Sequence, residues 1–265
     1  MRGEPRTENL EPAAPDNRAG WDAIAVDYQR ERGWPSDRLA WGVKAPFEDE
    51  LRLLGGVRGK SVVVLGCGGG QDIVALSKMG AREITGVDLS KPQLEHAVKL
   101  LAGQGVQARL IHESVEDLSA IPKESQDVAV SIHTLNYVEQ ADRCFQETHR
   151  VLRFGGLFAF SVQHPADAST QDEPPFGFEK PYFQVEFDWS WRGVGGEPRF
   201  RSYYRTVGDW FDLLRESRFT VEQVLEPRPV DDPVWHELAW ASMNDYEKYD
   251  TVPGTLIFVA RKPKR

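Results

Sequence analysis

Ser61-Val62-Val63-Val64-Leu65-Gly66-Cys67-Gly68-Gly69-Gly70-Gln71-Asp72 is the stretch that decides the fold of this 265-residue chain. A run of β-branched residues ends in four glycines within five positions, and apolar residues at helical spacing follow as far as Gly80. This order predicts a buried strand, a tight turn and a helix that begins at once. Glycines in such a turn let the backbone approach a ligand closely, and the free N–H groups of the helix start attract an anionic group.

A second short strand is predicted over residues 83–87, and Asp88 closes it. An acidic side chain at the end of the second strand is placed to accept hydrogen bonds from both hydroxyls of a ribose. A dinucleotide fingerprint has Gly or Ala three positions after its second glycine, and Gln71 stands there instead. The pattern therefore predicts a nucleoside cofactor and argues against NAD.

The glycine turn resembles motif I of the class I S-adenosylmethionine-dependent methyltransferases, in which L-G-C-G-x-G is typical. Residues 65–70 match that motif, whereas Val64 stands where the family usually has Asp or Glu. The resemblance implies an α/β fold with a doubly wound, seven-stranded, Rossmann-like sheet whose last strand pair is antiparallel, and S-adenosyl-L-methionine as cofactor. It also implies cofactor contacts at the turn and at the end of the second strand: Gly66, Cys67, Gly68, Gln71, Asp88 and Leu89.

The N-terminal region divides into two parts. Residues 1–18 are rich in Pro, Glu, Asp and Arg without periodicity, which predicts a disordered tail, with order beginning at Trp21. Residues 19–56 are predicted to form lid helices that precede a methyltransferase domain over residues 57–262. In the resembled family a W-D-x-x-A-x-x-Y stretch covers the cofactor, which implies that the Tyr28 hydroxyl lies near its carboxylate. The alternative is a packing helix whose tyrosine reaches to water.

Between the second and fourth strands the chain alternates helix and strand. A helix capped by Ser90 is predicted to bury Leu94, Ala97, Val98 and Leu101, and a third strand is predicted over residues 108–112. Where the resembled family often carries D-A-E-x-L against the adenine, this chain has Ser114, Val115 and Glu116. The resemblance therefore implies adenine contacts from Val115 and Glu116, with a serine in place of the usual acid.

The fourth strand, predicted over residues 125–132, leads into His133 and Tyr137. This exit lies at the carboxyl end of the sheet, where open α/β sheets bind ligands, and it resembles motif IV of the methyltransferases. His133 is thereby expected beside the cofactor. Methyl transfer needs a general base only if the acceptor must lose a proton, and the candidates are His164, His133 and Tyr137. The alternative for either histidine is a structural or substrate-contacting role.

Residues 164–205 interrupt the alternation of strands and helices after the fifth strand. This insertion carries ten aromatic residues among prolines, glycines and acids. Alternation over residues 182–191 and glycines at 193–196 predict a β-hairpin cap. Either the aromatic side chains bury one another, or they line a pocket for a planar or apolar small molecule, which we expect.

Composition and net charge indicate which classes of partner and ligand the chain is expected to bind. A formal net charge of -9 disfavours nucleic acid, because affinity for it depends largely on Lys and Arg. The two cysteines, Cys67 and Cys144, have no metal-ligand spacing, so we expect no metal. With no signal-peptide or membrane-spanning pattern, we expect a cytoplasmic protein without a membrane partner. The oligomeric state stays open.

These observations favour transfer of a methyl group from S-adenosylmethionine to a small, aromatic or apolar metabolite at O, N or C. An RNA-modifying methyltransferase is an alternative that the acidic composition disfavours. A protein that binds S-adenosylmethionine without transferring its methyl group is a second alternative, which Val64 and Ser114 keep open.

Overall fold

The computed structural model describes residues 15–191, 197–238 and 245–264. Its main sheet contains β1 (Ser61–Leu65), β2 (Glu83–Asp88), β3 (Arg109–His112), β4 (Gln126–Ile132), β5 (Leu152–Gln163), β8 (Thr220–Leu225) and β9 (Thr255–Arg261). These seven strands lie in the order β3-β2-β1-β4-β5-β9-β8. β1 to β5 pair in parallel, and β9 runs antiparallel to both β5 and β8. The predicted doubly wound, seven-stranded sheet with an antiparallel last pair is confirmed.

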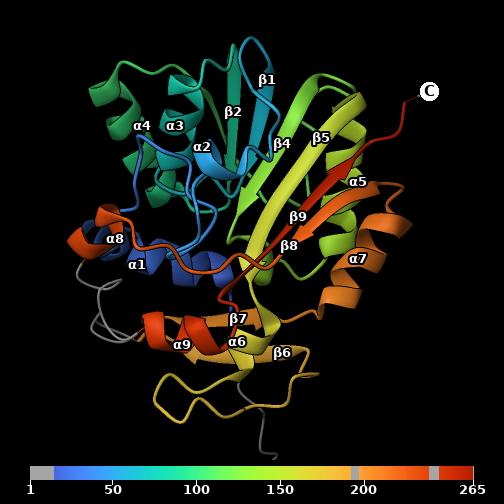
Figure 1. Ribbon diagram of the computed structural model, residues 1–265. Coiled ribbons are helices and arrows are strands. Elements are labelled where there is room, and N and C mark those ends of the chain that lie inside the picture. Colours follow the sequence, from blue (N-terminus) through green and yellow to red (C-terminus); the bar gives the residue numbers. More distant parts are fainter. Residues whose placement is uncertain (1–14, 192–196, 239–244, 265) are drawn as a thin grey trace, which may run out of the picture.

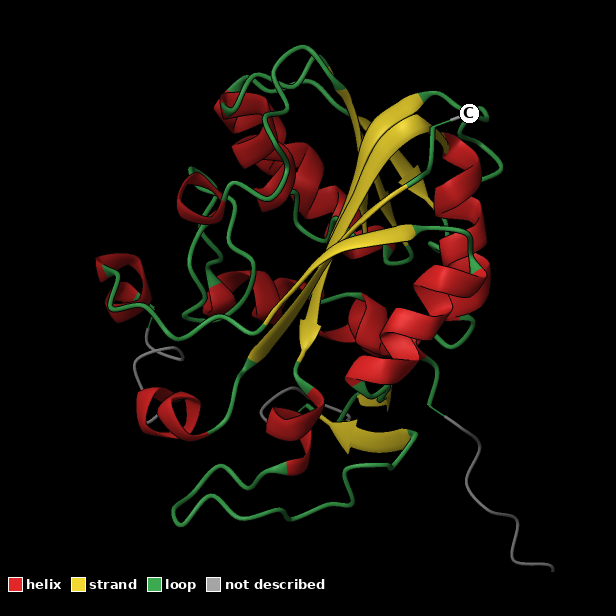
Figure 2. Cartoon of the chain, turned by 45° about the vertical axis from the view of Figure 1, so that its right-hand side comes forward, coloured by secondary structure: helices red, strands yellow, loops and turns green. Residues whose placement is uncertain are grey.

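Helices cover both faces of the sheet (Figures 1 and 2). The helices are α1 (Asn17–Arg32), α2 (Glu48–Leu51), α3 (Gln71–Lys78), α4 (Lys91–Gln104), the 3-10 turn η1 (Leu135–Tyr137), α5 (Ala141–Val151), α6 (Pro165–Ser169), α7 (Val207–Glu216), α8 (Pro233–Glu237) and α9 (Asp245–Thr251). α3 and α4 lie on one face, and α5 and α7 lie on the other (Figure 1). No helix within the described ranges has the length and apolar character needed to cross a membrane.

Successive side chains of β1 point to opposite faces of the sheet, and both faces are buried. Val62 and Val64 pack with Ile73 of α3, whereas Val63 and Leu65 belong to the cluster that contains Phe145 of α5. Val64, which replaces the family's usual acid, is fully buried. A carboxylate at this position would therefore depend on polar partners, because burying an unpaired charge is costly.

The structure differs from the expectation in three details, two of them in the N-terminal region. α1 begins at Asn17, capped by the Asp16 carboxylate, so order starts before Trp21 and the predicted tail is too long; residues 1–14 lie outside the described residues. Within residues 19–56, α1 is followed only by the one-turn α2, not by a second long helix. In α4, Val98 is 57% exposed, because the buried stripe runs through Leu94, Ala97 and Leu101 and turns away from it.

The insertion contains the expected hairpin. β6 (Glu186–Ser190) and β7 (Arg199–Tyr203) pair antiparallel, and the predicted turn at 193–196 lies outside the described residues. In Figure 1 the hairpin, α6 and α1 gather beyond the carboxyl ends of the parallel strands. The Asn17 amide joins them: it donates to the carbonyls of Tyr137 and Arg201 at 2.9 Å each, and its oxygen accepts from the Arg201 amide at 2.8 Å. The start of α1 is thus fixed between η1 and the hairpin.

Gly86 of β2 tests how tightly the glycine turn packs on the sheet. A Cβ atom there would lie 2.7 Å from Cys67 Sγ and 2.8 Å from Ile73 Cδ1. We expect Gly86→Ala to lower the free energy of unfolding by about 1–3 kcal/mol in urea titrations. Gly103→Ala is the matched control, because nothing lies within 4 Å of its added methyl group, and it should stabilise α4 by about 0.5–1 kcal/mol. An unchanged midpoint for Gly86→Ala would contradict this packing.

Candidate functional site

The glycine turn is held against β2 by its own backbone. The Gly66 and Cys67 amides donate to the Val87 carbonyl at 2.8 and 3.0 Å. Gly66 has a φ of +72°, and a Cβ atom there would lie 2.2 Å from the Thr134 side chain, so only glycine fits. The turn therefore lies at the carboxyl end of β1, next to the chain that leaves β4.

Asp88, the last residue of β2, connects the glycine turn to the residue that precedes α4. Its Oδ2 accepts from the Gly68 amide at 2.8 Å and its Oδ1 from the Ser90 amide at 2.9 Å. Burial raises the pKa of Asp88, and these two hydrogen bonds oppose the rise. Each carboxylate oxygen has a further lone pair, so Asp88 can accept hydroxyl groups from a ligand.

Two cavities meet at this edge of the sheet. The inner cavity has a volume of about 120 Å³ and the outer cavity about 500 Å³. Most of the predicted cofactor residues line the inner cavity: Tyr28, Gly66, Cys67, Gly68, Gln71, Asp88 and His133. Five residues line both cavities: Trp21, Tyr28, Trp34, His133 and Tyr137. The two spaces therefore adjoin.

Three predicted cofactor residues line neither cavity. Val115 is only 3% exposed and belongs to the core. Glu116 accepts hydrogen bonds from the Gln140 amide and the Ser114 hydroxyl, and the Leu89 carbonyl faces His112 Nε2 at 3.0 Å. As the structure stands, these side chains serve local packing and turn formation.

A chain of glutamines closes the inner cavity. Gln71 Nε2 donates to Gln29 Oε1 at 2.6 Å, and Gln29 Nε2 donates to Gln93 Oε1 at 2.6 Å. Gln29 also lies where a Cβ atom on Gly69 would be, at 2.5 Å. α1 is thereby held down on the glycine turn and on the start of α4, which explains the small volume.

Asp72 is a site residue that the sequence reasoning missed. It stands in the first turn of α3 and lines the inner cavity. Burial raises the pKa of Asp72 to about 7, and no hydrogen bond or ion pair from the described residues offsets that effect. The sequence does contain a signal for Asp72: an acid at the second position of the helix that follows the glycines. The resembled motif instead has its acid at the position of Val64. Such a carboxylate is suited to bind a cationic group of a ligand.

His133 lies between the two cavities in an unusual conformation. Its φ is +48°, a left-handed value that non-glycine residues adopt at a cost. Its Nε2 atom is buried without a hydrogen-bond partner among the described residues, and burial lowers the pKa of His133 to about 4. The imidazole is therefore neutral near pH 7, and its Nε2 atom packs against Gly42, where an added Cβ atom would lie 2.8 Å from it.

His164 does not reach the site. Its side chain is buried, its Nδ1 accepts from the Ala166 amide at 3.0 Å as the cap of α6, and its Nε2 lies 2.8 Å from Glu226 Oε1. Both ring nitrogens are engaged, and the residue lines neither cavity. The expectation that His164 acts as a base is replaced by a capping role.

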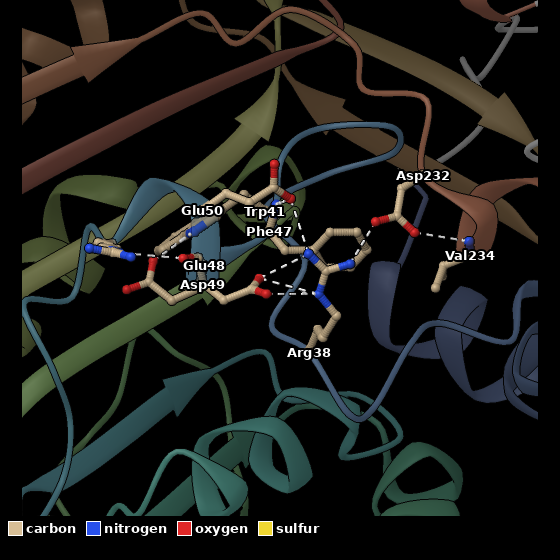
Figure 3. Close-up of polar contacts among 9 residues, drawn as sticks. Arg38, Trp41, Phe47, Glu48, Asp49, Glu50, Asp232 and Val234 are labelled. Atoms are coloured by element: carbon tan, nitrogen blue, oxygen red, sulfur yellow. Dashed lines mark hydrogen bonds and ion pairs between the residues drawn. The ribbon is translucent and has the colours of Figure 1, made fainter.

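A cluster around Arg38 supports the wall of the outer cavity (Figure 3). The guanidinium donates to Asp232 at 2.6 Å and to both Asp49 and Glu50 at 3.0 Å, and it lies 3.8 Å above the Phe47 ring. These contacts join the segment before α2 to the start of α8.

The same wall continues to Trp34. The Phe47 ring stacks on Trp235 at 5.3 Å, and Trp235 meets Trp34 edge to face at 6.1 Å. Trp34 Nε1 in turn donates to the Tyr28 hydroxyl at 3.1 Å. Residues far apart in the sequence thus fix the aromatic boundary between the cavities.

Comparisons with known proteins agree with this geometry. A family described as Methyltransferase domain matches residues 63–160. An uncharacterized protein of Haemophilus influenzae is 29% identical over 225 residues, which cover 81% of this chain and 86% of that protein. Human arsenite methyltransferase is 34% identical over 111 residues, which cover 38% of this chain and 30% of that enzyme.

A solved structure extends the likeness to most of the fold. The crystal structure of an S-adenosylmethionine-dependent methyltransferase from Mesorhizobium loti is 29% identical, has a TM-score of 0.65, and covers 80% of this chain and 96% of that one. The matched domain contains the last three residues of β1, the glycine turn and Asp88. Sheet order, turn and relatives together show that the chain belongs to the class I S-adenosylmethionine-dependent methyltransferases.

Proposed function

We propose that this enzyme transfers the methyl group of S-adenosylmethionine to a small molecule with an aromatic or apolar body, at O, N or C, bound in the outer cavity. One observation carries the proposal: the two cavities share five residues. A donor held by the glycine turn and an acceptor held by the aromatic wall would therefore be neighbours. Such alignment, with exclusion of water, supplies much of the rate of a methyl transfer.

The residues of the inner cavity fit the cofactor. Asp88 would accept the ribose hydroxyls, and the backbone of the glycine turn would lie against the nucleoside. Asp72 would bind the α-ammonium group and so take the place of the acid absent at Val64. Tyr28 would lie near the carboxylate. Because small-molecule pockets commonly occupy several hundred Å³, the 120 Å³ cavity must open when the cofactor enters.

The cofactor supplies an electrophilic methyl group on a sulfonium, and the protein positions the acceptor. His133 lines both cavities, and its neutral imidazole would accept a hydrogen bond from an acceptor hydroxyl or amine. Tyr137 lies on the same boundary and would orient the acceptor. We keep these two residues as the candidates for proton handling, and His164 is no longer one.

The lining of the outer cavity supports a small-molecule acceptor over RNA. Among the described residues that line it, Glu31 and Asp167 are acidic and none is lysine or arginine. Phosphate groups would meet no cation there, and the formal net charge of -9 opposes them further.

The direct experiment measures release of S-adenosylhomocysteine. The enzyme is incubated with S-adenosylmethionine and panels of phenols, amines, carbon acids and tRNA. Turnover with a small-molecule panel supports the proposal, and turnover with tRNA alone would replace it by RNA modification. Tight cofactor binding with no turnover on any panel would favour the protein that binds without transfer.

Asp88 provides the first test of cofactor binding. Asp88→Ala removes both proposed ribose hydrogen bonds. It should reduce the binding free energy of S-adenosylhomocysteine, measured by calorimetry, by roughly 2–4 kcal/mol. Glu95→Ala, an exposed acid on α4, is the control and should bind normally. A folded Asp88→Ala protein with normal affinity would show that Asp88 does not hold the ribose.

Asp72 provides a test with a pH signature. Since burial places the pKa of Asp72 at about 7 in the free protein, its carboxyl group is largely protonated at pH 6 and ionised at pH 8. An ammonium ligand binds the ionised form, so S-adenosylhomocysteine affinity should rise by about tenfold from pH 6 to pH 8. Asp72→Asn should bind weakly at both values and lose this rise.

Asp72→Asn, which should weaken ligand binding, should make the free protein more stable at high pH. A raised pKa means that the buried Asp72 carboxyl group lowers the free energy of unfolding: this cost is absent below the unfolded pKa, grows as the pH rises toward about 7, and is complete above it. Without cofactor, Asp72→Asn should therefore unfold at higher urea than the parent at pH 8 and near the parent at pH 4. A pH-independent affinity in the parent would contradict the role of Asp72.

A further inference from the structure

Five aromatic side chains form a closed ring at the boundary between the two cavities; we call them the aromatic collar. In order around the ring they are Trp21, Tyr28, Trp191, Trp189 and Tyr137. Successive ring centroids are 5.3, 5.8, 6.4, 6.3 and 5.2 Å apart. All five side chains line the outer cavity, and Trp21, Tyr28 and Tyr137 line the inner cavity too.

The collar is assembled from separate elements and supported from behind. Trp21 and Tyr28 come from α1, Tyr137 from η1, and Trp189 from β6. Phe200 of β7 is fully buried, stacks on Trp189 at 4.6 Å and contacts the Trp21 and Tyr137 rings. Trp189 Nε1 also donates to Ser202 Oγ at 3.0 Å. The aromatic rings are therefore held in place before a ligand arrives.

Among the described residues that line the outer cavity, those that carry a charge near neutral pH are acids. Glu31 lies one turn after Tyr28 on α1 and lines the outer cavity; its 3.3 Å contact with Arg30 is solvent-exposed and therefore weak. Asp167 also lines the cavity, but Lys248 Nζ balances it at 2.8 Å. His133 is uncharged near neutral pH because burial lowers its pKa to about 4. No lysine or arginine stands among the lining residues that the structure describes.

Aromatic faces carry negative electrostatic potential and attract cations, most strongly where water is excluded. A neutral apolar ligand would gain nothing from an acid beside the aromatic rings, whereas a cation would gain from both. We propose that the aromatic collar, with Glu31 beside it, binds a cationic nitrogen of the acceptor, so that the substrate is a small organic ammonium compound. This inference rests on the proposed function and narrows its substrate class.

The test compares a cation with its neutral isostere. Choline and the alcohol in which a quaternary carbon replaces its nitrogen have nearly the same shape, and ligand-observed NMR reports the binding of each. Sodium chloride at equal concentration controls for ionic strength. Choline should bind saturably and at least tenfold more tightly than the alcohol. Equal affinities, or no saturable binding of choline, would overturn the proposal.

Two substitutions locate the site. Trp191→Leu should lower the affinity for choline about tenfold. Glu31→Gln should lower it several-fold and leave the affinity for the alcohol unchanged. Phe183→Leu is the matched aromatic control, because this side chain of the same insertion is 80% exposed and lines neither cavity. Glu95→Gln is the matched acidic control. Choline affinity that is unchanged in both test variants would contradict a site at the collar.

Cofactor binding separates this proposal from the proposed function. S-adenosylhomocysteine has no positive sulfur, so its affinity should survive in Trp191→Leu while choline binding falls. If Trp191→Leu instead weakens S-adenosylmethionine and spares choline, the collar serves the cofactor's sulfonium and the proposal is wrong. If S-adenosylhomocysteine does not bind the parent protein at all, the proposed function fails, whatever choline does.

Discussion

The carboxylate of Asp88 accepts hydrogen bonds from the Gly68 and Ser90 amides at 2.8 and 2.9 Å, and the site depends on this pair of bonds. They join the glycine turn after β1 to the end of β2 and to the start of α4. The same group would bind the nucleoside, so one buried charge serves both the fold and the ligand. Burial raises the pKa of Asp88, and the two amide donors oppose that rise by favouring the ionised form.

Closure of the site follows from contacts across the chain. The glutamine chain of Gln71, Gln29 and Gln93 holds α1 on the turn, and Asn17 holds the start of α1 on the hairpin. Neutral hydrogen bonds of this kind each contribute about 1 kcal/mol, so cofactor binding can displace them. The inner cavity of about 120 Å³ agrees with our proposal that α1 is a lid, which carries Trp21 and Tyr28 of the aromatic collar.

Local patterns allowed the sheet, the glycine turn and Asp88 to be predicted, because strand, turn and helix follow one another directly between residues 61 and 88. Contacts between distant residues could not be predicted in this way. The sequence predicts a base at His164, because no local pattern indicates the contact between its ring and Glu226, which lies 62 residues away. The hairpin was expected, but its alignment with Trp21 and Tyr28 of α1 depends on tertiary packing. Asp72 is absent from the residues predicted for the site, because the resembled motif carries its acid at the position of Val64.

A crystal structure of the complex with S-adenosylhomocysteine tests the account most directly, because it shows the ligand, the lid and the aromatic collar together. The account predicts the ribose hydroxyls on Asp88, the α-ammonium group on Asp72, and the sulfur atom facing the ring formed by Trp21, Tyr28 and Tyr137. A nucleoside bound away from Asp88, or a sulfur atom directed away from the outer cavity, would contradict it.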